Sequence, residues 1–175
     1  MKEIKIQKAD KQDIDAVMQL MMEAKQKVKD PQWFATDNRD YVEKRVKKHG
    51  FILKACQEGK IVGFFIVDIP GREKENLGYD LGYSEEKLEQ VVHMDYAVVS
   101  KEAQGYGLQK RFVEEAEKRL CKTKYKYFLA TVHPDNVYSR RNMVQMGYRE
   151  AKQLLKYGGM PRIIMEKKKT DGFRF

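Results

Sequence analysis

The chain has 175 residues, of which 42% are apolar, so it can form one domain with a sizeable core. It has no apolar run of about 18 residues and no apolar stretch directly after Met1, so we expect neither a membrane-spanning helix nor a signal peptide, and we expect a cytoplasmic protein. Its two cysteines and three scattered histidines match no disulfide framework and no metal-site spacing. Thirty-five Lys and Arg against twenty-six Asp and Glu give a net charge of +9, which favours anionic partners, although a solvated basic surface is the simplest interpretation.

The first half of the chain alternates between strand and helix signals. Asp10, with Asp13 three residues later, predicts a capped helix start, and the apolar residues that follow have helical spacing. The predicted elements here are a strand at 4–7, a helix ending before Pro31, a helix at 39–48 that closes at Gly50, and a hairpin of strands 51–55 and 61–68.

The second half begins with a polar stretch, residues 71–90, for which we expect one helical turn near Glu85. After it we predict a strand at 91–99, a glycine-rich turn and a helix from Leu108, a strand at 125–132, a short helix capped by Asp135 or Asn136 that stops at Gly147, and strands at 148–156 and 162–167. This order predicts one α/β domain over residues 1–175, with a mixed, mostly antiparallel central sheet and helices on both faces.

The turn Gln104-Gly105-Tyr106-Gly107 lies between a strand and a helix. Glycines allow close backbone approach to a ligand, and the first amides of a helix attract an anion. Lys110 and Arg111 add positive charge, so the pattern predicts a phosphate or pyrophosphate site. A dinucleotide fingerprint would need glycine at 110, and the Gly-Lys-Ser/Thr of a Walker loop is absent.

A second motif follows the strand at 125–132. His133-Pro134-Asp135-Asn136 leads into a helix that carries Ser139 and Asn142, and Gly147-Tyr148 opens the next strand. Together the two motifs resemble the GNAT superfamily of N-acetyltransferases, whose pyrophosphate loop reads Gln/Arg-x-x-Gly-x-Gly/Ala. Gln104 and Gly107 match that loop, whereas its final small residue is Gln109 here.

The resemblance implies an enzyme that transfers an acetyl group from acetyl-CoA to a primary amine of a small molecule or a protein. It implies that backbone amides at Val98 and Val99 hold the pantetheine arm and polarise the thioester, and that Asn136 and Ser139 lie beside that arm. The implied pyrophosphate-binding residues are Gln104, Gly105, Tyr106, Gly107, Leu108 and Gln109.

The resemblance also suggests candidates for the catalytic acid and base. Family members often carry a tyrosine four residues after the serine as general acid, but that position is Met143 here. Tyr138 is a nearby substitute, or else a tyrosine that simply packs on its helix. Some members use a glutamate eleven residues before the loop glutamine as base, and the matching residue is His93, with Asp95 on the same strand face. A structural histidine is the alternative.

The acceptor site is not marked by a motif. Glu23, Trp33 and Phe34 are candidates to line a substrate cleft, and residues 71–90, at net −3, could attract a cationic amine or form a solvated loop. Two alternatives to an enzyme stay open, namely a basic module that binds nucleic acid or another anion, and an acyl-CoA-sensing domain without turnover. Neither nucleic acid nor a membrane is the expected partner, and the acceptor's identity and the oligomeric state, a homodimer included, are left open.

Overall fold

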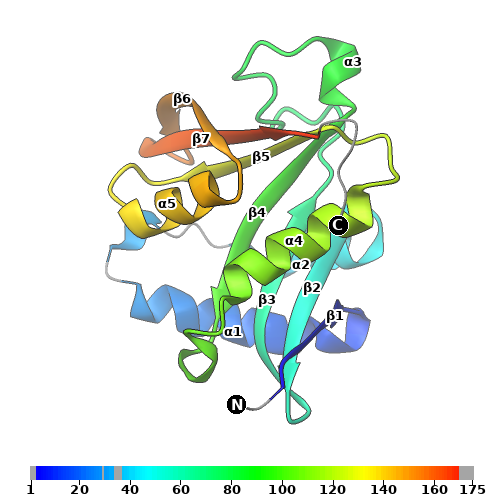
Figure 1. Ribbon diagram of the computed structural model, residues 1–175, viewed down its shortest axis with the longest axis vertical. Coiled ribbons are helices and arrows are strands. Elements are labelled where there is room, and N and C mark those ends of the chain that lie inside the picture. The colour runs from blue at the N-terminus through cyan, green and yellow to red at the C-terminus, as the bar shows by residue number, and fades with distance from the viewer. Residues whose placement is uncertain (1–2, 29, 34–36, 170–175) are drawn as a thin grey trace. The chain divides into compact units, whose positions relative to one another are not determined.

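The computed structural model describes residues 3–28, 30–33 and 37–169 (Figure 1). Besides short 3-10 turns, the elements in chain order are β1 (Lys5–Lys8), α1 (Ile14–Lys27), α2 (Arg39–Lys47), β2 (Gly50–Gln57), β3 (Lys60–Asp68), α3 (Glu85–Leu88), β4 (Val91–Val99), α4 (Leu108–Leu120), β5 (Tyr127–Val132), α5 (Val137–Gln145), β6 (Arg149–Lys156) and β7 (Met160–Lys168).

The strands form a seven-stranded sheet in the order β1-β2-β3-β4-β5-β7-β6. Antiparallel ladders join β1 to β2, β2 to β3, β5 to β7 and β6 to β7, whereas β4 and β5 are parallel. The expected mixed, mostly antiparallel sheet is therefore confirmed. The chain divides into two compact units, the first formed by Met1–Asp68 with Tyr96–Glu117 and the second by Ile69–Asp95 with Lys118–Phe175.

The first unit carries helices on both faces of its strands (Figure 1). Phe64 and Ile66 of β3 are buried in one core cluster with apolar residues of α1, α2 and β2. Phe65, which points the opposite way by strand alternation, stacks on Phe112 of α4 with ring centroids 6.0 Å apart. The expected placement of helices on two faces is thus confirmed for this unit.

Local sequence explains where the helices begin. The Asp10 side chain accepts from the backbone N–H of Gln12 at 2.8 Å, and the Asp13 carboxylate accepts from the N–H of Asp10 at 2.8 Å, which forms the predicted capping box before α1. The N–H of Tyr41 donates to Asn38 at 2.9 Å and caps α2 in the same manner.

The second unit contains the first half of β4 with β5, β7 and β6, and the segment 69–90 covers one face of these strands. Leu77 of that segment packs in a core cluster with Val91, Leu129 and Ile164. The helical turn expected near Glu85 is α3. The expected N-terminal cap of α5 is confirmed, because the Asn136 side chain accepts from the N–H of Ser139 at 3.1 Å. Gly147 lies just after α5 with φ of 89°, the left-handed conformation that a helix C-terminus requires.

Candidate functional site

The glycine-rich turn joins β4 to α4 in the first unit. Gly105 and Gly107 have φ of 84° and 64°, so both need the left-handed conformation that glycine adopts at little cost. The helix begins directly afterwards, at Leu108, which is buried and fixes the helix start in the core. Gln109, which stands where the family's loop ends in a small residue, therefore lies in the first turn of α4.

The glycine-rich turn is open on its outer side, which leaves room for a ligand. A Cβ atom built on Gly105 or on Gly107 would meet no atom within 4 Å, so the turn faces open space. The first amides of α4 have no acceptor inside the helix, and the helix dipole makes this end attractive to negative charge. The turn thus offers N–H groups, room and a favourable field to a pyrophosphate, as acetyl-CoA would require.

The end of β4 leads into the turn, and its backbone N–H groups differ in whether they point toward the neighbouring strand β3. The N–H of Ser100 donates to the carbonyl of Val62 on β3 at 2.9 Å. Because N–H groups alternate along an extended strand, the N–H of Val99 points away from β3, whereas that of Val98 points toward it. The ladder to β5 pairs Val91–His93 with Tyr127–Leu129 and includes none of the described later residues of β4. Of the two expected amides, Val99 is therefore the better donor to a ligand.

A cavity of about 320 Å³ lies beside this strand end. It is lined on one side by a single stripe of α1 and on the other by the end of β4 and the turn that follows it. The lining residues are Leu20, Glu23, Ala24, Lys27, Val98, Val99, Ser100, Lys101 and Gln104.

The structure thus brings Glu23, a candidate cleft residue, together with three expected cofactor-binding residues, Val98, Val99 and Gln104. Trp33 is half-buried and does not line this cavity, and Phe34 lies outside the described residues. The sequence analysis missed Leu20, Ala24 and Lys27. The available signal was helical spacing, because Leu20 and Lys27 lie three and four residues from Glu23, and Ala24 lies four residues from Leu20 and three from Lys27.

The cavity wall on α1 is charged. The Glu23 carboxylate accepts from the Gln19 side chain at 3.1 Å and lies 3.8 Å from the Lys27 ammonium group. Both partners are on the same helix, so Glu23 is held in place by neighbours one turn away. The pair places a carboxylate and an ammonium group on the cavity wall, so Glu23 can attract a cationic group, although the Lys27 charge weakens that attraction.

His93 lies on the first half of β4, in the second unit, and is buried. Its Nε2 accepts a hydrogen bond of 3.1 Å from the backbone N–H of Leu77. Because Nε2 accepts this hydrogen bond, the proton of the neutral ring is on Nδ1. The Nε2 lone pair is therefore already used by a residue of the segment 69–90. Asp95 lies two residues further along β4 and is only partly buried, and by strand alternation it is on the same face as His93, as expected.

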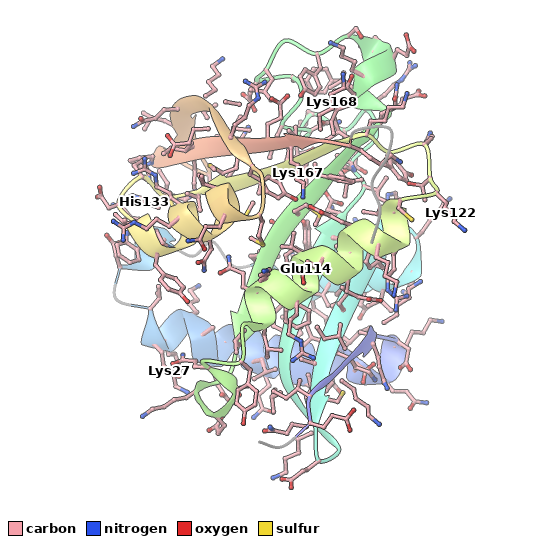
Figure 2. All side chains as sticks on the ribbon, in the orientation of Figure 1. Lys27, Glu114, Lys122, His133, Lys167 and Lys168 are labelled. Atoms are coloured by element: carbon pink, nitrogen blue, oxygen red, sulfur yellow. The ribbon has the colours of Figure 1, made fainter. Side chains whose placement is uncertain are left out.

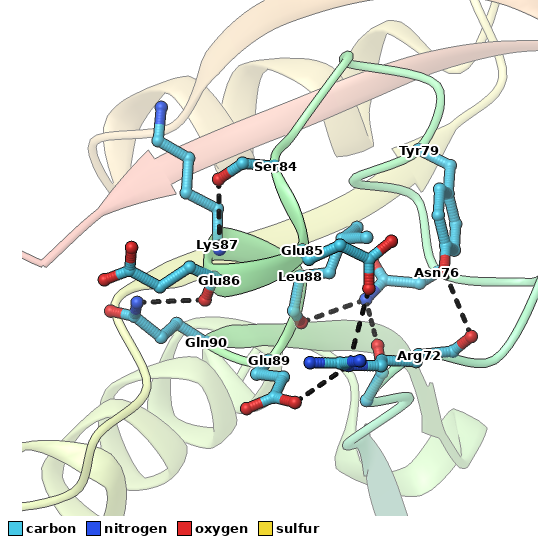
Figure 3. A network of polar contacts seen from close by, with 11 residues as sticks. Arg72, Asn76, Tyr79, Ser84, Glu85, Glu86, Lys87, Leu88, Glu89 and Gln90 are labelled. Carbon is cyan, nitrogen blue, oxygen red and sulfur yellow. Dashed lines mark hydrogen bonds and ion pairs between the residues drawn. The ribbon is translucent and has the colours of Figure 1, made fainter.

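The segment 69–90 is packed and cross-linked (Figure 3). The buried Asn76 donates to the carbonyls of Gly71 and Leu88, at 2.7 and 3.1 Å, and accepts from the N–H of Gly78. Arg72 forms ion pairs with Glu85 and Glu89 at 3.4 and 2.8 Å.

Two further acids of this segment are also paired. The carboxylate of Asp80 lies 2.6 Å from the Lys156 ammonium group, and Glu75 pairs with Lys74 at 3.7 Å. Arg72 and Lys74 are already counted in the net charge of −3, so among these partners only Lys156, from β6, weakens the field of the segment on an acceptor below that charge. The packed core of the segment also argues against a simple solvated loop.

The helix α5 carries the remaining candidates, in the second unit. Asn136 is its N-cap, and Met143, which stands where the family often has a tyrosine, is buried. Tyr138 is 77% exposed, so it does not pack as an ordinary core tyrosine. Ser139 donates its backbone N–H to Asn136 and is half-buried.

One cluster of titratable groups in the first unit was not foreseen. Arg45 and Asp68 are both buried, and the guanidinium donates to one carboxylate oxygen through Nε at 2.9 Å and Nη2 at 2.7 Å. Burial raises the pKa of the nearby Asp37 carboxyl above its ordinary value, and the Arg45 charge and a hydrogen bond from Tyr96 only partly oppose this shift.

Comparison with known proteins identifies the class. The family model described as the acetyltransferase (GNAT) family matches residues 14–148, more than half of the chain. The chain therefore belongs to the GNAT family of acetyltransferases, as its two motifs indicated. No protein with a curated description matches the sequence. Among the described residues, no helix is long and apolar enough to cross a membrane.

Solved structures share the fold. The ribosomal-protein-alanine N-acetyltransferase of Brucella melitensis has a TM-score of 0.72 and 18% identity, over 94% of this chain and 99% of that one. NAA60 of Arabidopsis thaliana in complex with acetyl-CoA has a TM-score of 0.72 and 15% identity, over 95% and 98%. An N-acetyltransferase of Staphylococcus aureus has a TM-score of 0.70 and 15% identity, over 95% and 98%.

Proposed function

We propose that this chain is an acetyl-CoA-dependent N-acetyltransferase that binds its cofactor along Val98–Gln109. The observation that carries the proposal is the open glycine turn before α4, beside a cavity lined by Val98, Val99 and Gln104. Membership of the GNAT family and a structural neighbour solved with acetyl-CoA support the same cofactor. Acetyl-CoA supplies the acetyl group as a thioester, and the protein has to orient that group and manage the protons.

We assign roles to the cofactor residues in two groups. Backbone amides of Gly105, Tyr106, Gly107, Leu108 and Gln109 would bind the pyrophosphate. The N–H of Gln104 already donates to the carbonyl of Lys101 at 3.3 Å, so Gln104 would contribute through its side chain. The N–H of Val99 would hold the pantetheine arm and donate to the carbonyl oxygen where negative charge develops. Asn136 and Ser139 would contact the pantetheine arm, and Asn136 would do so while it caps α5.

Proton transfer would take place at the His93–Asp95 part of β4. An acceptor amine must lose a proton before it can attack, so a base must lie within reach or be connected through one water. Because the Nε2 lone pair of His93 accepts from Leu77, we propose Asp95 as the proton acceptor and His93 as the residue that positions it. Tyr138 would serve as the proton donor to the leaving thiolate, since its hydroxyl is exposed.

The acceptor would be a primary amine of a small molecule or a protein. The Brucella melitensis neighbour is named for a ribosomal-protein alanine, so peptides with a free N-terminus are the first acceptors to test. Glu23 at the cavity rim would bind the ammonium form of such an amine before it loses its proton.

The test of the cofactor site compares two glycine variants. Gly107→Glu places a carboxylate in the proposed pyrophosphate site, whereas Gly59→Glu is the matched control in the β2–β3 turn. Both glycines have positive φ, 64° and 79°, and open space at Cβ, so both variants carry similar backbone strain. At a hundred times its dissociation constant, acetyl-CoA should stabilise the wild type and Gly59→Glu by roughly 2.7 kcal/mol.

Gly107→Glu should lose that thermal shift while it stays folded by circular dichroism. An equal shift in both variants would show that the cofactor binds elsewhere. Release of free thiol in the presence of an acceptor then separates an enzyme from a domain that only senses acyl-CoA.

A further inference from the structure

The positive charge of this chain is concentrated in two short segments. Residues 118–126 contain Lys118, Arg119, Lys122, Lys124 and Lys126 and no acid, and residues 167–169 are three lysines. Together these segments hold eight of the nine excess positive charges. The rest of the chain is nearly neutral, so the net charge is a local property.

The second unit brings these segments side by side. Tyr127 of β5 pairs with Lys168 of β7, and the N–H of Lys169 donates to the carbonyl of Lys126 at 2.8 Å. The Lys169 ammonium group donates to the carbonyls of Leu120, Cys121 and Thr123 at 3.4, 3.2 and 2.8 Å. Lys169 thus donates to backbone carbonyls at and just after the C-terminal end of α4, and this contact holds the two basic segments together.

Five lysines of this cluster are exposed and have no acidic partner among the described residues. Lys118, Lys122, Lys124, Lys126 and Lys168, which we call the basic surface, are all exposed, and none has a carboxylate partner in the part of the chain that is described. Figure 2 shows Lys122 projecting from the turn after α4 and Lys168 near the end of β7. Such a cluster raises the local positive potential, which counterions or a polyanion would lower.

Several lysines elsewhere on the surface form ion pairs with an acidic side chain. Lys44 pairs with Asp40 at 2.8 Å, Lys47 with Glu43 at 3.3 Å and Lys110 with Glu114 at 3.7 Å, each one helical turn apart. Other exposed lysines, such as Lys8, Lys48 and Lys60, also have no acidic partner among the described residues, but they are scattered along the chain. The basic surface is therefore distinguished by its density of lysines in two adjoining segments that contain no acid.

The residues of the basic surface indicate which class of partner it suits. A stable protein interface has an apolar or aromatic centre, and membrane binding needs apolar side chains that enter the lipid. The exposed large apolar residues of the described chain lie elsewhere, for example at Val137, Val144 and Leu155. Tyr127 lies under Lys87 and Lys168, at 6.0 and 5.9 Å from its ring centre, so it is not presented for base stacking.

We propose that the basic surface binds the phosphate backbone of a nucleic acid through charge alone, without base contacts. This proposal goes beyond the acetyltransferase activity and departs from the expectation that nucleic acid is not a partner. The sequence shows each basic segment separately, whereas the structure holds the two segments side by side through the pairing of Tyr127 with Lys168 and the hydrogen bond from Lys169 to Lys126. Such binding is independent of sequence and depends strongly on salt.

The test uses the full chain and short fluorescein-labelled probes. Fluorescence anisotropy would measure binding of single-stranded RNA, DNA of the same sequence and its duplex between about 50 and 200 mM salt. The variant is Lys122→Gln with Lys124→Gln and Lys126→Gln. The matched control is Lys5→Gln with Lys44→Gln and Lys47→Gln, which removes the same charge from lysines that have acidic partners.

The basic-surface variant should bind at least about tenfold more weakly and lower the slope of log affinity against log salt by about 2 to 3, because each lost phosphate contact contributes 0.7 to 0.9. The control should change affinity by less than about threefold. Tighter binding to RNA or to DNA would identify which nucleic acid is preferred. Equal binding to both would also support the proposal, because the phosphate backbone is common to them. Equal losses in both variants, or equally tight binding of polyglutamate or phosphatidylserine vesicles, would overturn the proposal.

Both variants should keep the thermal shift with acetyl-CoA, because the substituted lysines lie outside the cofactor turn. Loss of nucleic-acid binding with an intact shift would separate this proposal from the proposed enzymatic function.

Discussion

The hydrogen bond from Leu77 to His93 limits what the imidazole can do. A neutral ring with its proton on Nδ1 has one lone pair, and Nε2 already uses it to accept from a backbone N–H at 3.1 Å. If the acceptor is removed, a buried N–H stays unsatisfied, at a cost of about 1–3 kcal/mol. A structural role and a catalytic role for His93 therefore predict different results for different substitutions.

We expect His93→Gln to preserve most of the stability and activity, because its amide oxygen can accept from Leu77. His93→Ala should lower the melting temperature, and Asp95→Asn should lower kcat/KM by roughly 10²-fold as expected for loss of a general base. Kinetics with one acceptor and thermal unfolding of all three variants provide the measurement. A similar loss of activity in both His93 variants at normal stability would make His93 the base.

Asp37 provides a pH-dependent prediction. Burial raises the pKa of its carboxyl, with Arg45, Asp68 and Tyr96 as the neighbouring groups. Between the unfolded and folded pKa values the folded state binds more protons, so the contribution of this group to stability falls as pH rises through that window. At neutral pH the buried charge is destabilising, and below the ordinary carboxyl range, about pH 4, the effect disappears.

Asp37→Asn should therefore raise the melting temperature at pH 7, because the amide can still accept from Tyr96 without a charge. The gain should shrink as pH falls toward 4 and vanish below it. Thermal unfolding of both proteins across this range is the measurement. A constant difference at every pH would mean that the carboxyl is not the cause.

At the level of elements, one buried ion pair fastens α2 to the end of β3. Arg45 donates twice to Asp68, and its guanidinium also lies 3.5 Å from the ring centre of Tyr41 on the same helix. A buried pair gives little net stability over an apolar pair, but the loss of one partner leaves an uncompensated charge.

Arg45→Met and Asp68→Leu should each destabilise the protein by about 3–5 kcal/mol, whereas the double variant should recover much of the loss. Urea unfolding of the four proteins gives the coupling energy between the two positions. Strictly additive losses would show that the two side chains contribute independently.

At the level of the whole molecule, β4 is shared by the two units. Its residue Val91 belongs to the core of the second unit, and Val98 belongs to that of the first. A continuous strand that carries core residues of both units couples their unfolding, since neither core survives if the strand leaves the sheet. This arrangement agrees with one domain over residues 1–175, which stays a prediction.

We expect one cooperative thermal transition, with a calorimetric enthalpy equal to the van't Hoff enthalpy. Differential scanning calorimetry, repeated with acetyl-CoA, would measure it, and the single transition should move upward as a whole. Two separable peaks, of which acetyl-CoA moves only one, would contradict a single cooperative domain.

Local signals in the sequence were sufficient for the elements and for the family. The Asp10–Asp13 capping box, the Asn136 cap and the left-handed Gly107 each act over a few residues, so their positions could be predicted without tertiary contacts. The two motifs likewise indicated the GNAT family and the cofactor turn. Strand ends shifted by a few residues, since β5 begins at Tyr127 and not at 125, because pairing decides where a strand begins.

Only the tertiary structure decided which distant side chains meet. The hydrogen bond between Leu77 and His93, the ion pair between Arg45 and Asp68, and the cavity that joins Glu23 to Val99 all link residues far apart in the chain. The same holds for the two basic segments that Lys169 fastens together. The sequence determined local conformation and composition, because these depend on neighbours along the chain. Long-range packing determined the environment of each titratable group, because burial and partners arise only when the sheet forms.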